Sequence, residues 1–357
     1  MIRYAVIGCG VIGPVHAQAI SQIPEAQLMA VCDVDIARAQ KVADEYNVAV
    51  VMEDYRQILE RDDIDAICIC VPHYLHAQIA IEAAEAGKHI FCEKPMAIDP
   101  EDMDNMIDAA DDAGVQLGIC FQHRFDPVMI ELKKMVDEGK FGKLLMGSAQ
   151  VICLRDEAYY ASEDWRGKWE TEGGGVLINQ AIHTIDLMMW IFGEAESISG
   201  TYNTLRWDEI IEVEDTAVGV VEFENGAIGH INATSASNLN WDTSFHVYGT
   251  KGSAVVNTGF PNTFTKFEVE GMDAAPQIND EDCPTVGKAC YGNSHYHAIN
   301  AFTQALITNT PYPIDGHQAR QAVEVVLGLY NSCDDERKVL LPLSEDEQMM
   351  LDLEDND

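Results

Sequence analysis

Short apolar runs alternate with amphipathic segments over the first third of the chain. The apolar runs are typical of buried strands and cover residues 3–8, 28–32, 66–71, 89–92 and 115–120. Apolar positions recur with helical spacing at 15–23, 36–45, 75–86 and 100–113. Strands that alternate with helices of this length need right-handed crossovers, which place a parallel sheet between two layers of helices. The pattern predicts a doubly wound α/β domain over residues 1–121.

After residue 121 the hydrophobic pattern changes. Apolar and polar residues alternate in strand-like segments at 218–223, 227–233 and 245–248, and an Asn-Gly turn at 224–226 joins the first two as a hairpin. Helical spacing is found at 127–138, 296–307 and 317–334. We therefore expect an α+β domain with a large, mainly antiparallel open sheet over residues 122–357. Its role is predicted to be substrate binding and homo-oligomer formation.

Charge narrows the range of partners. The chain has 357 residues, with 22 basic and 60 acidic side chains and a formal net charge of −38. Such a surface repels phosphate backbones and anionic lipids, so neither nucleic acid nor a membrane is expected as a partner. The acidic stretch at 345–357 is predicted to be a solvated, frayed end.

The apolar N-terminal segment and the cysteines indicate a cytoplasmic protein. The start of the chain lacks the long apolar region of a signal peptide and turns at once into a glycine loop. The longest apolar candidate for a membrane span, residues 176–192, is broken by Asn179, Gln180, His183 and Asp186. The ten cysteines include no CxxC pair, and several lie in predicted strands, so reduced, buried thiols are expected.

A glycine loop follows the first predicted strand and opens the first predicted helix. It matches GxGxxG and consists of Gly8, Gly10, Val11, Ile12 and Gly13. Asp33 ends the second predicted strand, where an acid binds both ribose hydroxyls and repels a 2′-phosphate. This combination predicts a Rossmann domain that binds NAD rather than NADP, and the alternative is a structural glycine turn.

Lys94 follows the predicted strand 89–92, at the carboxyl edge of the sheet, where doubly wound folds bind their ligands. Taken alone, a solvated surface lysine is the more common explanation. The segments GCGVIG (8–13), VPHYLH (71–76) and AGKHIFCEKPMA (86–97) together resemble the Gfo/Idh/MocA family of sugar and polyol dehydrogenases. The resemblance continues at residues 122–125, 173–175 and 315–324 and covers almost the whole chain.

The resemblance implies roles for individual residues. Lys94 matches the catalytic lysine of the family's EKP motif, and His183 matches its catalytic histidine. The positions that line the cofactor in the family correspond to Pro72, His76 and Glu93.

One position departs from many family members. Inositol dehydrogenases have Asp four residues before the histidine, and here that residue is Asn179. A spacing of four places Asn179 and His183 on one helix face, but an amide cannot stabilise an imidazolium as a carboxylate does. The segment NQAIHTIDL is similar to the branch that oxidises the 3-hydroxyl of pyranosides, including UDP-N-acetylglucosaminuronate 3-dehydrogenases. The expected substrate therefore shifts from a cyclitol to a hexopyranoside.

Oxidation of a secondary alcohol by NAD needs a base for the hydroxyl proton. An imidazole with an ordinary pKa of about 6.5 suits this role near neutral pH, which favours His183. Lys94 can instead stabilise the developing alkoxide, or can itself take the proton if burial lowers its pKa. The sequence leaves both assignments open, with Asn179 as a third catalytic candidate.

An aromatic segment offers a wall for a sugar ring. Tyr160 and Trp165 lie in it, and pyranose faces pack on such rings, although a buried core is the equal alternative. Arg124 and Arg155 are cations predicted to bind substrate, or else are ordinary ion-pair partners. No metal is predicted, because the pairs His183/Asp186 and His295/His297 lack a third placed ligand.

The leading hypothesis is an NAD-dependent oxidoreductase that oxidises a hexopyranose or glycoside, at C3, to a keto sugar. One alternative is a UDP-N-acetylglucosaminuronate-type 3-dehydrogenase. A second is an enzyme that retains NAD and cleaves a glycoside through transient oxidation. A third is a non-catalytic sugar or NAD sensor, against which the presence of both Lys94 and His183 argues.

Overall fold

The computed structural model describes residues 1–239, 241–278, 284–288 and 292–344, and the expected frayed tail at 345–357 lies outside them. The chain divides into two compact units. The first comprises Met1–Phe125 with Asp282–Ala319, and the second Asp126–Glu281 with Arg320–Asp357. The expected boundary at 121/122 assigned all of residues 122–357 to one domain and did not foresee that Asp282–Ala319 belongs to the first unit. That boundary, as a division between cofactor and substrate binding, stays a prediction.

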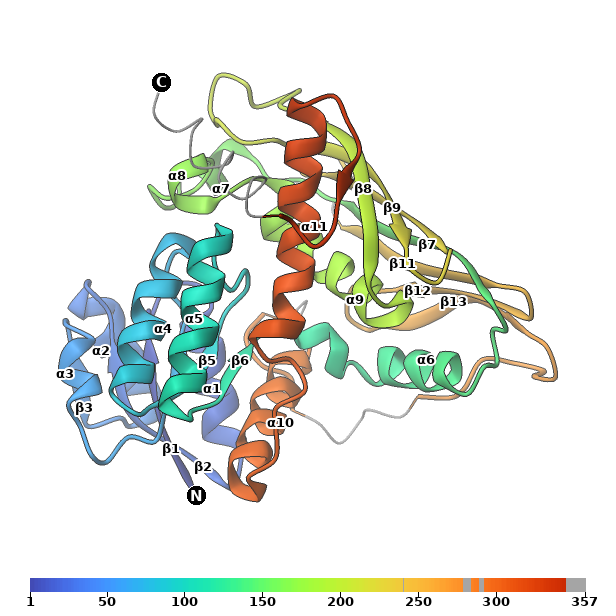
Figure 1. The fold of residues 1–357 in the computed structure, drawn as a ribbon. Helices are drawn as coiled ribbons and strands as arrows, with labels where there is room; N and C mark the ends of the chain where they lie inside the picture. Colours follow the sequence, from blue (N-terminus) through green and yellow to red (C-terminus); the bar gives the residue numbers. More distant parts are fainter. Residues whose placement is uncertain (240, 279–283, 289–291, 345–357) are drawn as a thin grey trace. The chain divides into compact units, whose positions relative to one another are not determined.

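A six-stranded parallel sheet forms the core of the first unit (Figure 1). Its strands are β1 Ile2–Ile7, β2 Ala26–Cys32, β3 Val50–Met52, β4 Ala66–Ile69, β5 His89–Cys92 and β6 Leu117–Ile119. Their order across the sheet is β3-β2-β1-β4-β5-β6, so the winding direction reverses between β1 and β4. Ligands of such folds bind outside the carboxyl ends of the strands at this reversal. The predicted doubly wound domain is confirmed, and β3 is an addition that the sequence pattern did not predict.

Helices cover both faces of this sheet. They are α1 Gly13–Gln22, α2 Ile36–Tyr46, α3 Arg56–Leu59, η1 His73–Leu75, α4 His76–Glu85, α5 Pro100–Ala113, η2 Gln122–Phe125 and α10 Ser294–Thr308. Right-handed crossovers place α1 and α2 on one face and α4 and α5 on the other. Helix α10 comes from the end of the chain and packs on α1. Helix α10 therefore lies on the same face as the helix that follows the glycine loop.

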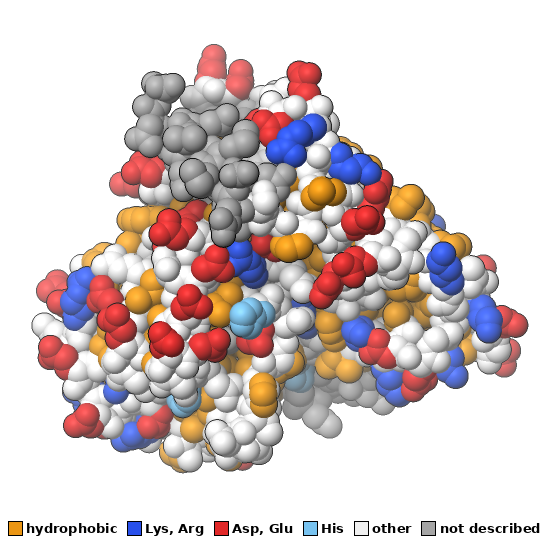
Figure 2. Space-filling model, in the orientation of Figure 1, with side chains coloured by type: hydrophobic (Ala, Val, Ile, Leu, Met, Phe, Trp, Pro, Cys, Tyr) orange, Lys and Arg blue, Asp and Glu red, His pale blue; other side chains and the backbone are white. Residues whose placement is uncertain are grey.

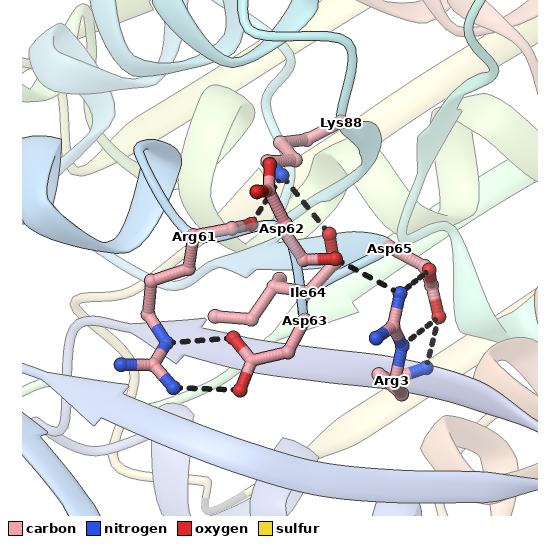
Figure 3. A network of polar contacts seen from close by, with 7 residues as sticks. All are labelled: Arg3, Arg61, Asp62, Asp63, Ile64, Asp65 and Lys88. Carbon is pink, nitrogen blue, oxygen red and sulfur yellow. Dashed lines mark hydrogen bonds and ion pairs between the residues drawn. The ribbon is translucent and has the colours of Figure 1, made fainter.

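Charged residues close the amino edge of the sheet (Figure 3). Arg3 in β1 donates from Nε and Nη2 to the carboxylate of Asp65, just before β4, at 2.9 and 2.6 Å. Lys88, just before β5, donates from Nζ to the carbonyls of Arg61 and Ile64 at 2.6 and 3.1 Å. These contacts hold the loops at the edge opposite to the one where the candidate residues lie.

The second unit is built on an eight-stranded sheet. Its strands are β7 Leu144–Ile152, β8 Ala195–Asn203, β9 Thr216–Phe223, β10 Ile228–Thr234, β11 Asp242–Gly249, β12 Gly252–Asn257, β13 Thr263–Val269 and β14 Val339–Leu340. The order is β13-β12-β11-β7-β10-β9-β8-β14. All neighbours are antiparallel except β7 and β10, which are parallel. The expected large, mainly antiparallel sheet is confirmed, with the hairpin β9–β10 at the predicted Asn-Gly turn.

One face of this sheet is covered by helix α9. The helices of the unit are α6 Pro127–Asp137, α7 Glu157–Tyr160, α8 Trp169–Glu172, the π-helical turn η3 Leu177–Ala181, α9 Ile182–Phe192 and α11 Gly316–Asp334, which begins in the first unit. Helix α9 packs on β7 and β11. The helical stretch Trp169–Phe192 has the length and hydropathy of a membrane span, but 83% of its apolar window is buried inside the protein. It is accounted for as the core helix of this unit.

Candidate functional site

The glycine loop has the shape that a dinucleotide site requires. A Cβ at Gly8, where φ is +92°, would lie 2.4 Å from the carbonyl oxygen of Cys70, and a Cβ at Gly13 would lie 1.9 Å from that of Gly8. These two glycines allow the tight turn and the close approach of α1 to β1. A Cβ at Gly10 would meet no protein atom nearer than Nη1 of Arg38, at 3.7 Å. The loop is therefore closed toward the protein and open above Gly10, the position where a pyrophosphate approaches the backbone.

The N-terminus of α1 points its positive dipole end at the glycine loop, with no side-chain cap in the way. Ile12 is the N-cap and gives no side-chain cap, Pro14 follows Gly13, and the turn carries no acidic residue. Val11 is half exposed at the tip of the loop. The helix dipole favours an anion at this position, so these residues fit the pyrophosphate of NAD.

Asp33 is held against the glycine loop. Its Oδ2 accepts a hydrogen bond from Cys9 N at 2.6 Å and its Oδ1 accepts one from Asp35 N at 2.8 Å. The side chain is only 9% exposed. Both oxygens are thus oriented by backbone groups, one in the glycine loop and one after β2, and the predicted ribose contact requires such a fixed carboxylate. Arg38 lies beside the loop and is a candidate for contact with the phosphates of the cofactor. The motif analysis did not identify this residue.

Alanine at Gly10 is expected to separate cofactor binding from stability. A Cβ fits beside Arg38 but occupies the approach of the pyrophosphate, so the Kd for NAD should rise at least about tenfold, or 1.4 kcal/mol, measured by titration calorimetry. The free energy of unfolding should stay within about 0.5 kcal/mol of wild type. Gly13→Ala is the matched contrast. Its Cβ would clash with the backbone of Gly8, so this variant should lose both NAD affinity and free energy of unfolding. Unchanged NAD affinity in Gly10→Ala would contradict the assignment of the loop.

The Glu93-Lys94-Pro95 turn follows β5. Oε1 of Glu93 lies 2.7 Å from Nε2 of His16, and the side chain is 7% exposed. Burial by itself would raise the pKa of Glu93, but the hydrogen bond with His16 and the electrostatic effects of His16, His295 and Lys94 together outweigh it and lower the pKa to about 2. Glu93 is therefore ionised and turned into the protein, while Lys94 beside it is partly exposed.

Two further predicted cofactor residues support this turn. His76 is fully buried, and its Nδ1 and Nε2 lie 2.7 and 3.0 Å from the carbonyl oxygens of Pro95 and Val71. The ring connects the segment after β4 to the turn after β5. Pro72 is the N-cap of η1 in the same segment. The structure thus brings Pro72, His76 and the Glu93–Pro95 turn together at the carboxyl edge, and their contact with the cofactor stays a prediction.

His183 and Asn179 lie at the start of the core helix of the second unit. Asn179 belongs to the π-helical turn η3 and His183 to the first turn of α9. The helix face expected for these two residues includes a π-helical turn, because η3 is wound more widely than an α-helix. Each residue of a π-helical turn rotates less about the helix axis than in an α-helix. Residues four positions apart, such as Asn179 and His183, therefore still lie on one side of the helix. Both side chains are partly exposed.

A buried glutamate fixes the beginning of this helical segment. Glu214 accepts hydrogen bonds from Gly175 N at 2.7 Å, Leu177 N at 2.8 Å and the Tyr330 hydroxyl at 3.0 Å. A Cβ at Gly175 would lie 1.8 Å from the Glu214 carbonyl oxygen, and one at Gly174 2.2 Å from the Tyr330 hydroxyl. The glycine triplet 173–175 therefore permits this close approach. Burial raises the pKa of Glu214 to about 7.

Stability is expected to depend on pH through Glu214. Because its folded pKa of about 7 lies above the ordinary value of 4.5, the ionised form is disfavoured in the folded state, and stability is lost as pH rises through this window. Relative to Glu214→Gln, wild type should lose at most about 3 kcal/mol between about pH 5 and about pH 8. Urea unfolding of both proteins across this range measures the difference. If the difference in free energy of unfolding between wild type and Glu214→Gln does not change with pH, the raised pKa of Glu214 is contradicted.

Tyr159 is the centre of a polar network that the sequence did not predict. Its hydroxyl accepts hydrogen bonds from Arg166 Nη1 and from Asn179 Nδ2, the latter at 3.2 Å. Asn179 Nδ2 also donates to Oε1 of Glu172, which is 2% exposed. A carboxylate therefore stands next to Asn179 even though the residue itself is uncharged. No local motif marks this contact, since it depends on the fold of the segment between β7 and η3.

The predicted substrate residues separate into different environments. Tyr160 is 8% exposed, and its hydroxyl lies 3.1 Å from Ser235 Oγ inside an apolar cluster, which matches the core alternative that the sequence left open. Arg155 stacks on Tyr159 at 4.6 Å from the ring centroid. Trp165 is partly buried beneath the guanidinium of Arg166, at 4.5 Å. Within this unit, Arg155 and Trp165 lie beside the Tyr159 network, whereas Tyr160 packs in the apolar cluster.

Arg124 belongs to the first unit. It lies in η2, is 5% exposed, and its Nη1 donates to Gln318 Oε1 at 3.4 Å. A role in substrate binding stays a prediction.

Comparison with known proteins places this chain among oxidoreductases. Residues 2–121 match the oxidoreductase family with an NAD-binding Rossmann fold, and residues 129–255 match the Gfo/Idh/MocA C-terminal domain. The chain is 33% identical over 320 residues to the uncharacterized oxidoreductase YrbE of Bacillus subtilis, covering 89% of this chain and 90% of that protein. It is 29% identical over 358 residues to the D-glucoside 3-dehydrogenase of Escherichia coli, covering 95% and 97%.

A similar solved structure is that of the WlbA dehydrogenase from Bordetella pertussis in complex with NADH and UDP-GlcNAcA. It has a TM-score of 0.83 and 30% identity, and the match covers 96% of this chain and 99% of that one. Together these similarities establish an NAD-dependent oxidoreductase that acts on sugar or polyol alcohols, with NAD as the cofactor. The chain belongs to the Gfo/Idh/MocA oxidoreductase family.

Proposed function

We propose that this protein oxidises the C3 hydroxyl of a neutral hexopyranose or glycoside to a ketone, in the cytoplasm. The observation that carries the proposal is Asn179, an uncharged residue four positions before His183 whose amide nitrogen donates to Glu172 and Tyr159. The carboxylate–histidine pair of the inositol dehydrogenases is therefore not present at this position. Similarity to a D-glucoside 3-dehydrogenase and to a dehydrogenase bound to a UDP-sugar supports a pyranoside instead.

Charge favours a neutral substrate over a nucleotide sugar. Acidic side chains are spread over the viewed surface with only scattered basic ones (Figure 2), as the net charge of −38 requires. The far field slows the encounter with an anion. Arg155 and Arg166 are engaged with aromatic rings, since their guanidinium groups lie 4.6 and 4.3 Å from the Tyr159 centroid. This stacked arrangement of Arg155 and Arg166 suits contact with the face of a sugar ring better than binding of a diphosphate.

Within this proposal the protein supplies binding and proton transfer. NAD, when bound, takes the hydride from the sugar carbon, and the hydroxyl proton passes to a base. His183 takes that proton, and Lys94 stabilises the negative charge that develops on the same oxygen. Asn179 is held by Glu172 and Tyr159 and orients the sugar through its amide.

The test measures reduced-nicotinamide absorbance when purified protein and NAD are mixed with D-glucose, methyl glucoside, myo-inositol or a UDP-linked N-acetylglucosaminuronate. We expect reduction with glucose or the glucoside. Deuterium at C3 of that substrate should appear in the reduced cofactor, whereas deuterium at C2 should not. Reduction only by myo-inositol or only by the UDP-sugar would contradict the neutral pyranoside. Release of the aglycone without net reduction of NAD would favour a glycoside-cleaving enzyme that retains its NAD. No reduction and no cleavage with any of the four compounds would favour a sensor.

We also propose a homo-oligomer formed through the open sheet of the second unit. Its outward face carries Met146, Val218, Val220 and Ile228, each between 42% and 49% exposed. Ile228 pairs with Met146 across β10 and β7, so these apolar side chains are neighbours on one face. Light scattering should give a multiple of 39.4 kDa for wild type and a smaller assembly for Val218→Lys/Val220→Lys. A monomeric wild type would contradict the proposal.

A further inference from the structure

Four potential metal ligands meet inside the first unit, and of these only Glu93 is also among the predicted cofactor residues. His16 lies on α1, Glu93 follows β5, Cys120 follows β6, and His295 lies on α10. One ligand atom from each lies within 4.8 Å of all the others. Nε2 of His16 is 2.7 Å and Nε2 of His295 is 3.9 Å from Oε1 of Glu93. The donors come from four elements that are far apart in the sequence.

The cluster is closed to solvent. His16 and Cys120 are 0% exposed, His295 is 3% exposed and Glu93 is 7% exposed. Strands β5 and β6 are paired neighbours, and α10 packs on α1, so the backbone around the four donors is fixed by the sheet and by helix packing. Four protein ligands with no open position are typical of a structural metal site rather than a catalytic one.

The donor chemistry selects the metal. Two imidazoles, one thiolate and one carboxylate are ligands that zinc accepts, whereas magnesium and calcium prefer oxygen alone. A thiolate and a carboxylate balance the two positive charges of Zn²⁺, so the filled site would be neutral in a buried environment. Tetrahedral zinc, with bonds of about 2.0–2.3 Å, needs neighbouring ligands about 3.5 Å apart, so the donors have to move by about an ångström.

We propose that His16, Glu93, Cys120 and His295 bind one structural zinc ion that joins α10 to the carboxyl edge of the Rossmann sheet. Binding releases the thiol proton of Cys120 and any proton on the imidazoles, and no oxidation or reduction takes place. The ion connects residue 295 to residues from the first 120 of the chain. It therefore stabilises the attachment of this late segment to the first unit. The proposal is independent of the substrate, because no ligand is left for a reacting group.

Metal analysis of the full-length protein, purified without chelators and passed through a desalting column, tests the site. We expect one zinc per chain in wild type, and loss of zinc in Cys120→Ser and in His295→Gln. Cys68→Ser is the matched control, because Cys68 is equally buried on β4 but lies outside the cluster. It should keep its zinc. Removal of the metal by chelation should lower the melting temperature of wild type by at least about 5 °C, and added Zn²⁺ should restore it.

A second measurement does not depend on whether the variants fold. Cobalt in place of zinc in wild type should give a near-ultraviolet thiolate charge-transfer band and the strong visible absorption of a tetrahedral site. Zinc-free wild type that neither binds added Zn²⁺ nor gains thermal stability from it would overturn the proposal and leave a buried hydrogen-bonded ion pair. Zinc that remains in both folded cluster variants would also overturn it, because the acidic surface would then be its source.

Discussion

Turnover of the Lys94→Met variant is expected to fall by about a thousandfold, with the fold intact. Lys94 follows β5 at the carboxyl edge of the sheet, directly after a buried Glu93 that fixes the turn. Methionine keeps the length of the stem and removes the charge that would stabilise the developing alkoxide. Loss of one preorganised donor of this kind costs about 10²–10³ in turnover, and loss of a base costs about 10²–10⁴.

Lys88→Met is the matched control for this prediction. Lys88 precedes the same strand, and its Nζ donates to two backbone carbonyls at the amino edge (Figure 3). Methionine leaves those carbonyls without this donor, so about 1–3 kcal/mol of stability should be lost. Turnover per folded molecule should not change. Steady-state kinetics and urea unfolding of both variants give opposite patterns, and near-normal turnover in Lys94→Met would remove the lysine from the mechanism.

Local sequence signals were enough for the doubly wound fold of residues 1–121, although not for β3 or for the late segment that joins the first unit. The glycine loop and Asp33 are close to one another in the sequence, and each carries its own geometric requirement, such as the 1.9 Å approach at Gly13. The alternation of strands and helices determines a parallel sheet, because right-handed crossovers leave few other topologies. The fold class and NAD as the cofactor could therefore be predicted before any coordinates.

Contacts between distant segments could not be predicted in this way. Glu214 reaches the start of η3 from the loop before β9, and only the glycine triplet 173–175 hinted that something approaches there. Periodicity likewise did not distinguish the adjacent rings of Tyr159 and Tyr160. In the structure the first is the centre of a hydrogen-bond network and the second is core.

Helix geometry near the candidate histidine shows a related limit. Four-residue spacing predicted the shared side of Asn179 and His183 but not the π-helical turn between them. The hydrogen bonds that Glu214 accepts at the start of this segment come from a distant part of the chain and are not visible in a short window of sequence.

Replacement of His183 by Asn is expected to lower turnover by about 10²–10⁴ and to change its dependence on pH. A base must be unprotonated to accept the hydroxyl proton, so wild-type turnover should fall on the acid side as the imidazole is protonated. The variant has no imidazole, so this acid limb should disappear, and added imidazole should restore part of the rate. His317→Asn, at an exposed histidine at the start of α11, is the control and should keep both the rate and the acid limb.

The same profiles decide which residue is the base. If His183 accepts the proton, Lys94→Met keeps the acid limb at a reduced rate, because the lysine then only stabilises charge on oxygen. If Lys94 accepts it, the limb persists in His183→Asn and is lost in Lys94→Met. Turnover of all three proteins as a function of pH, with the substrate identified by cofactor reduction, distinguishes the two. A His183→Asn variant with wild-type turnover and an unchanged acid limb would exclude the histidine from proton transfer, whatever its position on α9.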